Sequence, residues 1–292
     1  MARKDCGIII VECAACPMKG LEEATGAGKR GVVNENGLAV ASPCSSRQLE
    51  LMEKVPDRPR QAVILAGGRG VRLRPITDAR PKPMIEFHGK PFLQYLVEML
   101  RDQEFERIVL LLGYLPDVII DHFGDGRGLG VNITYSVTRP DDLTGRRVRH
   151  AAPLLDDRFL LMYCDNYWPM QFNEMWRQYS ESGRPVQVTV YANADCVSRS
   201  NVRVAADGAV EVFDRSRVTP GLQGVEIGFA IVNKAVALAL LPKRQLLLED
   251  AVYPPLVERR ALHAFVTDRR YYSVGDQDRL AATEDYLATV NA

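Results

Sequence analysis

A glycine-rich turn follows directly on a short apolar run in this chain, and few folds accommodate that order. Residues 61–83 read QAVILAGGRGVRLRPITDARPKP. Residues 62–66 are apolar and end at glycines, as a buried parallel strand does. Gly67, Gly68 and Gly70 can adopt positive φ and let a ligand approach the bare backbone. Successive amide N–H groups in such a turn form a concave anion site, which predicts a triphosphate-binding turn.

Two cations follow the turn. The planar fork of Arg72 can grip phosphate oxygens with two donors at once. Lys82 stands between Pro81 and Pro83, which hold this segment extended and stiff. We therefore predict that Lys82 offsets charge on a transferring phosphoryl group. Each of these features alone is common in ordinary turns and loops, whereas their ordered conjunction indicates a phosphate site.

From residue 61 onward, short apolar strands alternate with amphipathic helices. We expect strands at 62–66, 107–112, 131–137, 158–164 and 185–191. We expect helices at 91–101, 116–123 and 171–181. This alternation predicts an α/β fold with a mainly parallel, Rossmann-like sheet flanked by helices. Ligands of such sheets bind at the carboxyl ends of the strands, where both the glycine turn and Asp165 are expected to lie.

At these residues the chain resembles the sugar-1-phosphate nucleotidyltransferases, also called nucleotide-sugar pyrophosphorylases. Their signature LAGG-x-G-(T/S)-R-L-x-P-x-T-x-x-x-PKP stands here at residues 65–83, with Val71 in place of the usual Thr or Ser. The resemblance covers residues 61–292 and implies that they form a nucleotidyltransferase domain, preceded by an extension of unknown role at 1–60. It implies transfer of NMP from an NTP to a sugar 1-phosphate, giving an NDP-sugar and pyrophosphate.

The resemblance also assigns residues to roles. The nucleotide-binding residues are Leu65, Ala66, Gly67, Gly68, Gly70, Thr144 and Gly145, and the catalytic residues are Arg72 and Lys82. Asp165 corresponds to the family's metal-binding Asp and suits Mg²⁺, which takes one or two carboxylates and fills its other positions with phosphate oxygens and water. Ser273 stands where the family has its second metal carboxylate. Asp276 is a candidate substitute ligand, with a helix N-cap as its alternative role.

Two further stretches resemble the family's sugar-phosphate site. The stretch DGAVEVFDR, at residues 207–215, resembles D-G-x-V-x-x-F-x-E-K, so that Asp214 and Arg215 would contact the sugar and its phosphate. An exposed hairpin is an equal alternative for it. The stretch VEIGFAIV resembles an N-x-G-x-Y strand. There Glu226 replaces Asn as a ligand for a sugar hydroxyl, and Gly228 would let the sugar approach.

The sequence leaves the nucleobase open. Residues 143–148 (LTGRRV) resemble the T-G-x-R-(L/V) of glucose-1-phosphate cytidylyltransferases, where many members have L-G-T-A-G-A packing on the base. Residues 85–135 look more like the heptose- and mannose-1-phosphate guanylyltransferases. Arg146 and Arg147 would contact a base edge or a phosphate, or else be solvated loop charges.

Composition limits the other function classes. The chain has 37 basic and 37 acidic residues, so its formal net charge is zero and nothing favours nucleic acid or an anionic membrane as a partner. Hydrophobic residues make up 47%, enough for a sizeable core, and no apolar stretch approaches the length of a membrane span. Without targeting signals, we expect a cytoplasmic protein. Its oligomeric state is open, with a homo-oligomer as one option.

Residues 1–60 lack the alternation of strands and helices. Cys13 and Cys16 form a single C-x-x-C without a second close pair, so reduced thiols are favoured over a zinc knuckle. We also consider Met52 as the natural first residue, because it would place the glycine turn near the N-terminus, as in the family.

Three other functions compete with the enzyme. A non-catalytic nucleotide-sugar-binding regulatory subunit on the same fold is favoured by Ser273. A glycosyltransferase usually has a D-x-D metal motif, which the DNY at residues 165–167 lacks. A Rossmann dehydrogenase needs G-x-G-x-x-G, and position 73 is Leu.

Overall fold

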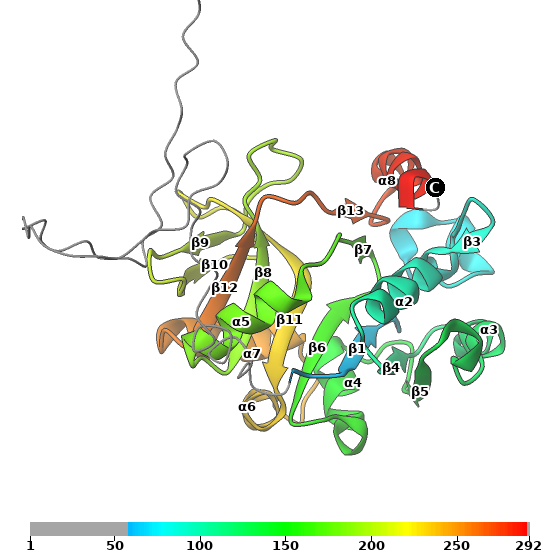
Figure 1. Ribbon diagram of the computed structural model, residues 1–292, viewed down its shortest axis with the longest axis horizontal. Helices are drawn as coiled ribbons and strands as arrows, with labels where there is room; N and C mark the ends of the chain where they lie inside the picture. Colours follow the sequence, from blue (N-terminus) through cyan, green and yellow to red (C-terminus); the bar gives the residue numbers. More distant parts are fainter. Residues whose placement is uncertain (1–57, 291–292) are drawn as a thin grey trace, which may run out of the picture. The chain divides into compact units, whose positions relative to one another are not determined.

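The computed structural model describes residues 58–290, which form an α/β fold with one large sheet (Figure 1). The sheet has seven strands in the order β12-β8-β11-β6-β1-β4-β5. Their bounds are β1 (Gln61–Leu65), β4 (Arg107–Leu112), β5 (Asn132–Val137), β6 (Arg158–Tyr163), β8 (Val186–Tyr191), β11 (Val225–Asn233) and β12 (Leu262–Thr267). All neighbours are parallel except β11, which runs antiparallel to both β6 and β8. The predicted fold class is confirmed.

Apolar residues on both faces of the sheet explain its burial. All five residues of β1 are buried. Successive residues of a strand point to opposite faces. Accordingly, Ala62 and Ile64 belong to one core cluster, and Val63 and Leu65 belong to the other. A strand that is apolar on both faces needs helices on both sides, which is why the run at 62–66 predicted a parallel sheet.

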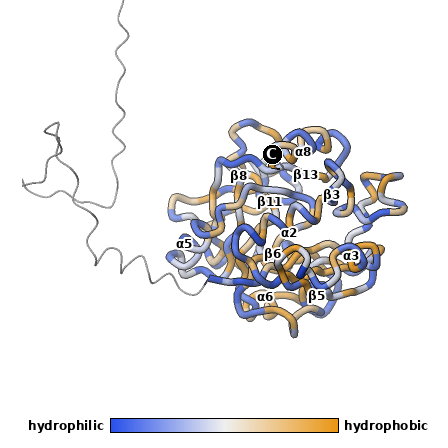
Figure 2. The backbone as a smooth tube through the Cα atoms, turned by 45° about the vertical axis from the view of Figure 1, so that its right-hand side comes forward, coloured by the Kyte–Doolittle hydropathy of each residue, from blue (hydrophilic) through white to orange (hydrophobic). Residues whose placement is uncertain are grey.

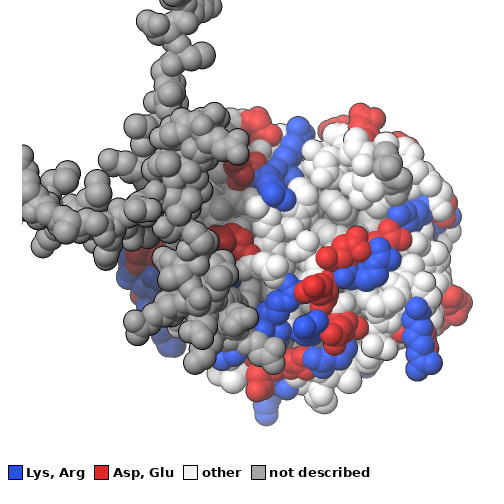
Figure 3. Space-filling view, viewed as in Figure 1, with Lys and Arg blue, Asp and Glu red and all other residues white. Residues whose placement is uncertain are grey.

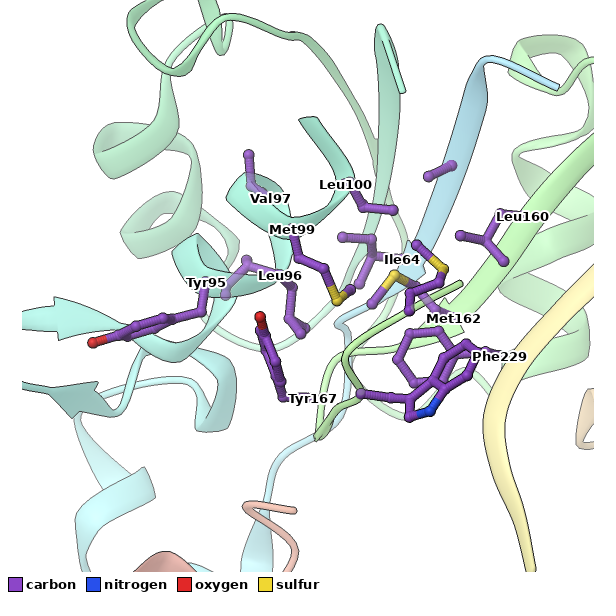
Figure 4. Close-up of a cluster of buried hydrophobic side chains, with 14 of the residues drawn as sticks. Ile64, Tyr95, Leu96, Val97, Met99, Leu100, Leu160, Met162, Tyr167 and Phe229 are labelled. Atoms are coloured by element: carbon purple, nitrogen blue, oxygen red, sulfur yellow. The ribbon is translucent and has the colours of Figure 1, made fainter. Parts of the chain in front are cut away.

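Helices cover both faces. The first core cluster includes residues from α2 (Phe92–Asp102), α3 (Pro116–Phe123), α5 (Phe172–Ser182) and α8 (Gln277–Val290). The second includes residues from α4 (Thr144–His150), α6 (Lys234–Leu240) and α7 (Leu248–Glu258). Figure 4 shows part of the first cluster, where Leu96 and Met99 of α2 lie near Ile64 and Met162. Hydrophobic segments, orange in Figure 2, run through the region of β6.

The predicted elements match the observed ones closely. Each strand and helix expected from the sequence is found within one residue of its predicted bounds. Pro91 was expected to open a helix, but it lies in β3 (Lys90–Pro91), with an extended ψ of 142°, because it pairs there with Glu86. The helix α2 therefore begins at Phe92.

Three small antiparallel ribbons complete the fold: β2 (Glu86–Phe87) with β3, β7 (Asn166–Tyr167) with β13 (Tyr272–Ser273), and β9 (Val202–Val204) with β10 (Val210–Phe213). Short 3-10 turns lie at η1 (Val71–Leu73), η2 (Ile76–Asp78), η3 (Lys82–Met84), η4 (Arg127–Leu129) and η5 (Ala152–Leu154). Stacking of Tyr286 on Tyr272, with ring centroids 3.7 Å apart, fixes α8 against the β7–β13 ribbon. In Figure 1, α8 lies beside the segment of β3.

Within residues 58–290, no helix has the length and apolar character needed to cross a membrane. On the face shown in Figure 3, basic and acidic side chains are interspersed rather than gathered by sign. Residues 1–57 lie outside the described residues. They include most of the extension at 1–60, the C-x-x-C motif of Cys13 and Cys16, and Met52, the hypothetical natural first residue. The domain boundary near residue 60 stays a prediction.

Candidate functional site

A cavity of about 540 Å³, hereafter the first cavity, opens at the carboxyl ends of β1 and β6. This is the edge at which ligands of parallel α/β sheets bind. It is lined by Leu65, Gly67, Gly68, Gly70, Val71, Arg72, Lys82, Pro83, Pro140, Asp141, Asp142, Leu143, Thr144, Arg147, Tyr163, Cys164, Asp165, Leu247 and Gly275. The glycine turn and the Pro-Lys-Pro segment therefore border one space.

Gly70 allows the Pro-Lys-Pro segment to pack against the turn. Its φ is 64°, a left-handed conformation that favours glycine. A Cβ at this position would lie 2.9 Å from the Cβ of Lys82, so any larger residue would displace the lysine. The hydroxyl of Thr77 donates a hydrogen bond of 3.0 Å to the carbonyl oxygen of Gly70 and fixes the turn from the other side. At Gly68, by contrast, an added Cβ would meet nothing within 4 Å.

Lys82 and Asp165 form an ion pair at the cavity. The Nζ of Lys82 lies 2.8 Å from Oδ2 of Asp165, and their side chains are 11% and 30% exposed. Arg72 is exposed on η1 and lines the same cavity. Among residues 58–290, no carboxylate lies within ion-pair distance of Arg72, so its charge is open to an anionic ligand. The two predicted cations and the predicted acid thus share one site.

A second cavity of about 330 Å³ adjoins the first and shares Arg72, Asp165 and Gly275 with it. Its other lining residues are Asn166, Arg217, Val225, Glu226, Tyr271, Ser273, Asp276 and Arg279. Asp165 therefore stands at the junction of two spaces. Two substrates bound side by side would both lie next to this carboxylate.

Ser273 lies directly beside Asp165. The ribbon of β7 and β13 pairs Ser273 with Asn166, and the Ser273 hydroxyl donates to the backbone carbonyl of Asp165 at 3.2 Å. The same carbonyl accepts the N–H of Val274 at 2.9 Å. The position at which the resembled family has its second metal carboxylate is therefore next to the first, and a neutral hydroxyl stands there.

Asp276 combines two roles. Its Oδ1 accepts the backbone N–H of Arg279 at 3.2 Å, and its Oδ2 lies 3.5 Å from Nε of the same arginine. These contacts cap the start of α8, as the alternative prediction had it, while the side chain also lines the second cavity. Nowhere in residues 58–290 do three His, Cys, Asp or Glu side chains gather as a metal cluster. The donor set fits an ion such as Mg²⁺ that takes most of its ligands from substrate and water.

Arg147 is not a solvated charge: it borders the first cavity, but its guanidinium is buried beneath the glycine turn and donates to protein acceptors. Nη1 donates to the carbonyl of Leu112 and to the hydroxyl of Thr138, each at 2.6 Å. Nη2 donates to the carbonyls of Gly67, Arg139 and Pro140 at 3.0 to 3.1 Å.

Two glycines make room for this guanidinium. A Cβ on Gly67 or Gly113 would lie 2.4 Å or 2.3 Å from its atoms. Segment 143–148, considered a loop from its sequence, forms α4 instead, and Val148 packs into the core from this helix. Arg147 thereby joins the glycine turn, the end of β4 and the loop after β5.

We expect Arg147→Met to lower the free energy of unfolding by about 2–4 kcal/mol, because it removes five hydrogen bonds that a buried guanidinium makes to three separate segments. Urea denaturation of the purified protein measures this. Arg146→Met is the matched control, since Arg146 is the neighbouring residue on α4, is half exposed and pairs with Asp142 at 3.2 Å. Its loss should cost less than about 1 kcal/mol. Equal effects of the two substitutions would contradict the bracing role of Arg147.

The remaining predicted nucleotide-binding residues differ in position. The Thr144 hydroxyl lines the first cavity and accepts the N–H of Leu248 at 2.8 Å, at the start of α7. The N–H of Gly145 donates to the carbonyl of Leu246 at 3.1 Å, and a Cβ would approach that oxygen to 2.7 Å. Ala66 is buried. Gly145 and Ala66 support the walls and are not among the described residues that line the cavity.

Asp214 and Arg215 line neither cavity, although the sequence placed them in the sugar-phosphate site. The hydroxyls and N–H groups of Ser216 and Thr219 and the N–H of Val218 all donate to the Asp214 carboxylate. These bonds hold the pKa of Asp214 well below its usual range. Hydrogen bonds to this carboxylate shape the loop that follows β10. For the stretch before this loop, the sequence also allowed an exposed hairpin.

Glu226, predicted to bind a sugar hydroxyl, lines the second cavity, and its Oε1 accepts the N–H of Gly228 at 2.7 Å. Burial, with the neighbouring charges of Glu249 and Asp165, raises the pKa of Glu226 to about 8. Gly228 has a φ of 82°, and a Cβ there would lie 3.0 Å from the ring of Tyr163. The space beside Gly228 is thus taken by this ring.

Comparison with known proteins identifies the family. Residues 61–212 match the model of the Nucleotidyl transferase family, which is more than half of the chain. The chain belongs to this family. A UTP–glucose-1-phosphate uridylyltransferase of Haloferax volcanii is 36% identical over 121 residues, covering 41% of this chain and 49% of that protein. A mannose-1-phosphate guanyltransferase of Candida glabrata is 28% identical over 239 residues, covering 79% and 66%. The chain thus spans about half to two thirds of these relatives.

Two solved structures share the fold. HddC from Yersinia pseudotuberculosis superposes with a TM-score of 0.65 at 22% identity, over 78% of this chain and 99% of that one. The structure of a "Putative Glucose-1-Phosphate Thymidylyltransferase" from Bacillus anthracis gives a TM-score of 0.68 at 18% identity, over 77% of this chain and 94% of that one.

Sequence reasoning missed two arginines of this nucleotidyltransferase-family site. Arg217 and Arg279 line the second cavity together with Arg72. Arg217 lies two residues after Arg215, the arginine chosen by resemblance, and Arg279 lies in the first turn of α8. No motif marks either residue, because each reaches the cavity through the path of its loop or helix.

Proposed function

We propose that residues 61–292 form a nucleotidyltransferase domain that transfers NMP from an NTP to a sugar 1-phosphate, giving an NDP-sugar and pyrophosphate. The observation that carries this proposal is the Lys82–Asp165 pair, 2.8 Å long, at the junction of two cavities. Membership of the family and the names of its relatives support the reaction class.

The first cavity would hold the NTP. Backbone N–H groups of Gly67, Gly68 and Gly70 bind the triphosphate, as suits a turn of this kind. Arg72 and Lys82 offset the charge that develops on the phosphates. Leu65 and Thr144 line the cavity and would contact the base and ribose directly. Ala66 and Gly145 would support these walls from behind.

The reaction would be a direct in-line displacement. A phosphate oxygen of the sugar 1-phosphate attacks the α-phosphorus, a new P–O bond forms, and the bond to the β-phosphate oxygen breaks. Pyrophosphate leaves with that electron pair, and no proton needs to move. The protein contributes positioning and charge stabilisation. Burial raises the pKa of Cys164, which lines the first cavity, to about 12, so this thiol stays protonated and is unsuited to act as a nucleophile.

We propose Mg²⁺ as the cofactor. Asp165 would bind it, and Asp276 is the candidate for a second carboxylate, because both line the second cavity. When bound, Mg²⁺ neutralises charge on the phosphate oxygens. A cytoplasmic location and a homo-oligomer stay predictions from the sequence.

The proposal is tested by measuring pyrophosphate release from five NTPs (ATP, GTP, CTP, UTP and dTTP) with glucose, mannose and heptose 1-phosphates. One NTP–sugar combination should dominate, and omission of Mg²⁺ should abolish release. Binding of an NTP without release of pyrophosphate in any combination would instead favour the regulatory subunit. The neutral Ser273 beside Asp165 is the feature that favours this alternative.

The raised pKa of Glu226 gives the reaction a pH dependence. A carboxyl with a pKa of about 8 is mostly protonated at pH 7 and ionises as the pH rises through 8. Ionisation places a negative charge in the second cavity, where the sugar phosphate would bind. We expect the KM for the sugar 1-phosphate to rise about 5- to 10-fold between pH 7 and pH 9.

Steady-state kinetics of Glu226→Gln are the control for this prediction. Gln has the same shape without the ionisation, so its KM should stay flat over the same pH range. The charges facing Glu226 from neighbouring elements, Glu249, Asp165 and Arg215, are unchanged in this variant. An equally steep rise in both proteins would assign the pH dependence to another group.

A further inference from the structure

Three arginines line the second cavity. Arg72 comes from η1, Arg217 from the loop after β10, and Arg279 from α8. Three guanidinium groups from three separate segments border about 330 Å³. The acids that line the same space are Asp165, Glu226 and Asp276. Of these, Asp165 is paired with Lys82 and Asp276 with Arg279, so part of the positive charge has no acidic partner.

Arg215 is not available to a ligand of this cavity. Its Nη1 donates to both carboxylate oxygens of Asp250 on α7, at 2.9 and 3.0 Å. Its side chain is 45% exposed, and it is not one of the residues that line either cavity within residues 58–290. The arginine that resemblance placed in the sugar-phosphate site ties the loop to α7 instead.

The loop is shaped so that Arg217 reaches the cavity. Arg217 has a φ of 60°, which is uncommon for a residue other than glycine and needs support from its surroundings. The bonds from Val218 and Thr219 to Asp214 supply that support. Arg217 Nη1 also donates to the carbonyl of Arg199 at 2.8 Å, and Arg199 Nη2 donates back to the carbonyl of Arg217 at 3.0 Å.

The charge of Arg217 has no acidic partner. No carboxylate lies within ion-pair distance of it in the part of the chain from 58 to 290. Arg279 is more constrained, with Nη2 donating to Ser198 Oγ at 3.0 Å and Nη1 donating to the Tyr271 hydroxyl at 3.4 Å. A fixed guanidinium and an unpaired one that line the same cavity suit a dianionic phosphate, which can accept bonds from both.

We propose that Arg217, assisted by Arg279, binds the phosphate of the sugar 1-phosphate, in place of Arg215. This inference rests on the proposed function. Arg72 and Asp165 belong to both cavities, so a phosphate bound between Arg217 and Arg72 would lie beside the NTP site. Its oxygen would then face the α-phosphorus from the side opposite to pyrophosphate.

The test compares four variants in the pyrophosphate-release assay, with glucose 1-phosphate and mannose 1-phosphate as the probes. Arg217→Met should raise the KM for the sugar 1-phosphate about 10- to 100-fold and leave the KM for the NTP within about 3-fold. Arg217→Lys should recover part of the loss. Arg177→Met, which removes a half-exposed arginine on α5, should leave both KM values unchanged. Arg215→Met, which removes an exposed ion pair, should raise the KM for the sugar 1-phosphate by less than about 3-fold.

A KM effect in Arg215→Met without one in Arg217→Met would overturn the proposal, as would equal effects in both. If the wild-type protein releases no pyrophosphate, the proposed function fails, and the arginine assignment is then tested by binding. The two sugar phosphates should raise the Tm of the wild type and of Arg215→Met but not that of Arg217→Met. No shift in the wild type, or the same shift in all three proteins, would refute the phosphate site itself.

Discussion

Replacement of Lys82 by Ala is expected to lower kcat about 10²- to 10³-fold, the usual effect of removing one positioned donor from a transition state. The ammonium is nearly buried, packs against Gly70 and points to the junction of the two cavities. Asp165 holds it in place, and the phosphate oxygens of a bound NTP would compete for it. Single-turnover measurement of pyrophosphate release reports this loss.

Lys90→Ala is the matched control for Lys82. Lys90 forms a similar ion pair, 2.7 Å long and with Glu98, and its side chain is 21% exposed. It lines neither cavity among the described residues. Both variants should keep a cooperative thermal transition, and only Lys82→Ala should lose turnover. Near-normal kcat in a folded Lys82→Ala protein would count against the proposed chemistry.

Asp165→Asn is expected to lower kcat by a factor on the order of 10²–10³ and to raise the Mg²⁺ concentration needed for half-maximal rate. An amide oxygen is a neutral, weaker ligand for Mg²⁺ than a carboxylate. Ser273 at the neighbouring position is neutral, and the pKa of Glu226 is raised to about 8. Among the described residues of this cavity, Asp276 is therefore the remaining candidate for a second negative charge beside the metal. Titration of the initial rate with Mg²⁺ measures the effect.

Asp156→Asn controls for the loss of a partly exposed, ion-paired carboxylate. Asp156 pairs with Arg107, and its side chain is 32% exposed, against 30% for Asp165. Arg107 begins β4, so this pair lies at the amino ends of the strands, away from the cavities. The same dependence on Mg²⁺ in Asp165→Asn and the wild type would show that the metal binds elsewhere.

Much of the fold was predictable from local patterns. Residues 108–112 are apolar throughout and 116–123 begin with a helix-starting proline, so both elements were found at their observed bounds. The antiparallel direction of β11 was not predictable, because the sequence VEIGFAIV is equally apolar for either direction of pairing. Strand order likewise depends on contacts between distant segments.

The convergence of Lys82 with Asp165 was also accessible from the sequence, since the carboxyl ends of parallel strands share an edge. The roles of Arg147 and Arg217 were not. Arg147 has acceptors in the separate segments around Gly67, Leu112 and residues 138–140, so no short motif shows them together.

Arg215 and Arg217 lie in the same loop, and the path of this loop decides which of them lines the second cavity. Asp214 bends this loop by accepting five hydrogen bonds, and the bend brings Arg217, rather than Arg215, to the cavity. Resemblance to a linear motif matched the order of the charged residues in the sequence, but it could not show which side chain lines the cavity. The hydrogen-bonding residues Asp214, Ser216 and Thr219 are the only sequence signal of this turn.

A crystal structure with a non-hydrolysable NTP analogue and Mg²⁺ tests the shared phosphate site most directly. The phosphates should accept bonds from the backbone N–H groups of the glycine turn, the metal should bind the Asp165 carboxylate, and Lys82 Nζ should contact phosphate oxygen. A nucleotide bound outside the first cavity, or phosphates remote from both Lys82 and Asp165, would contradict the account.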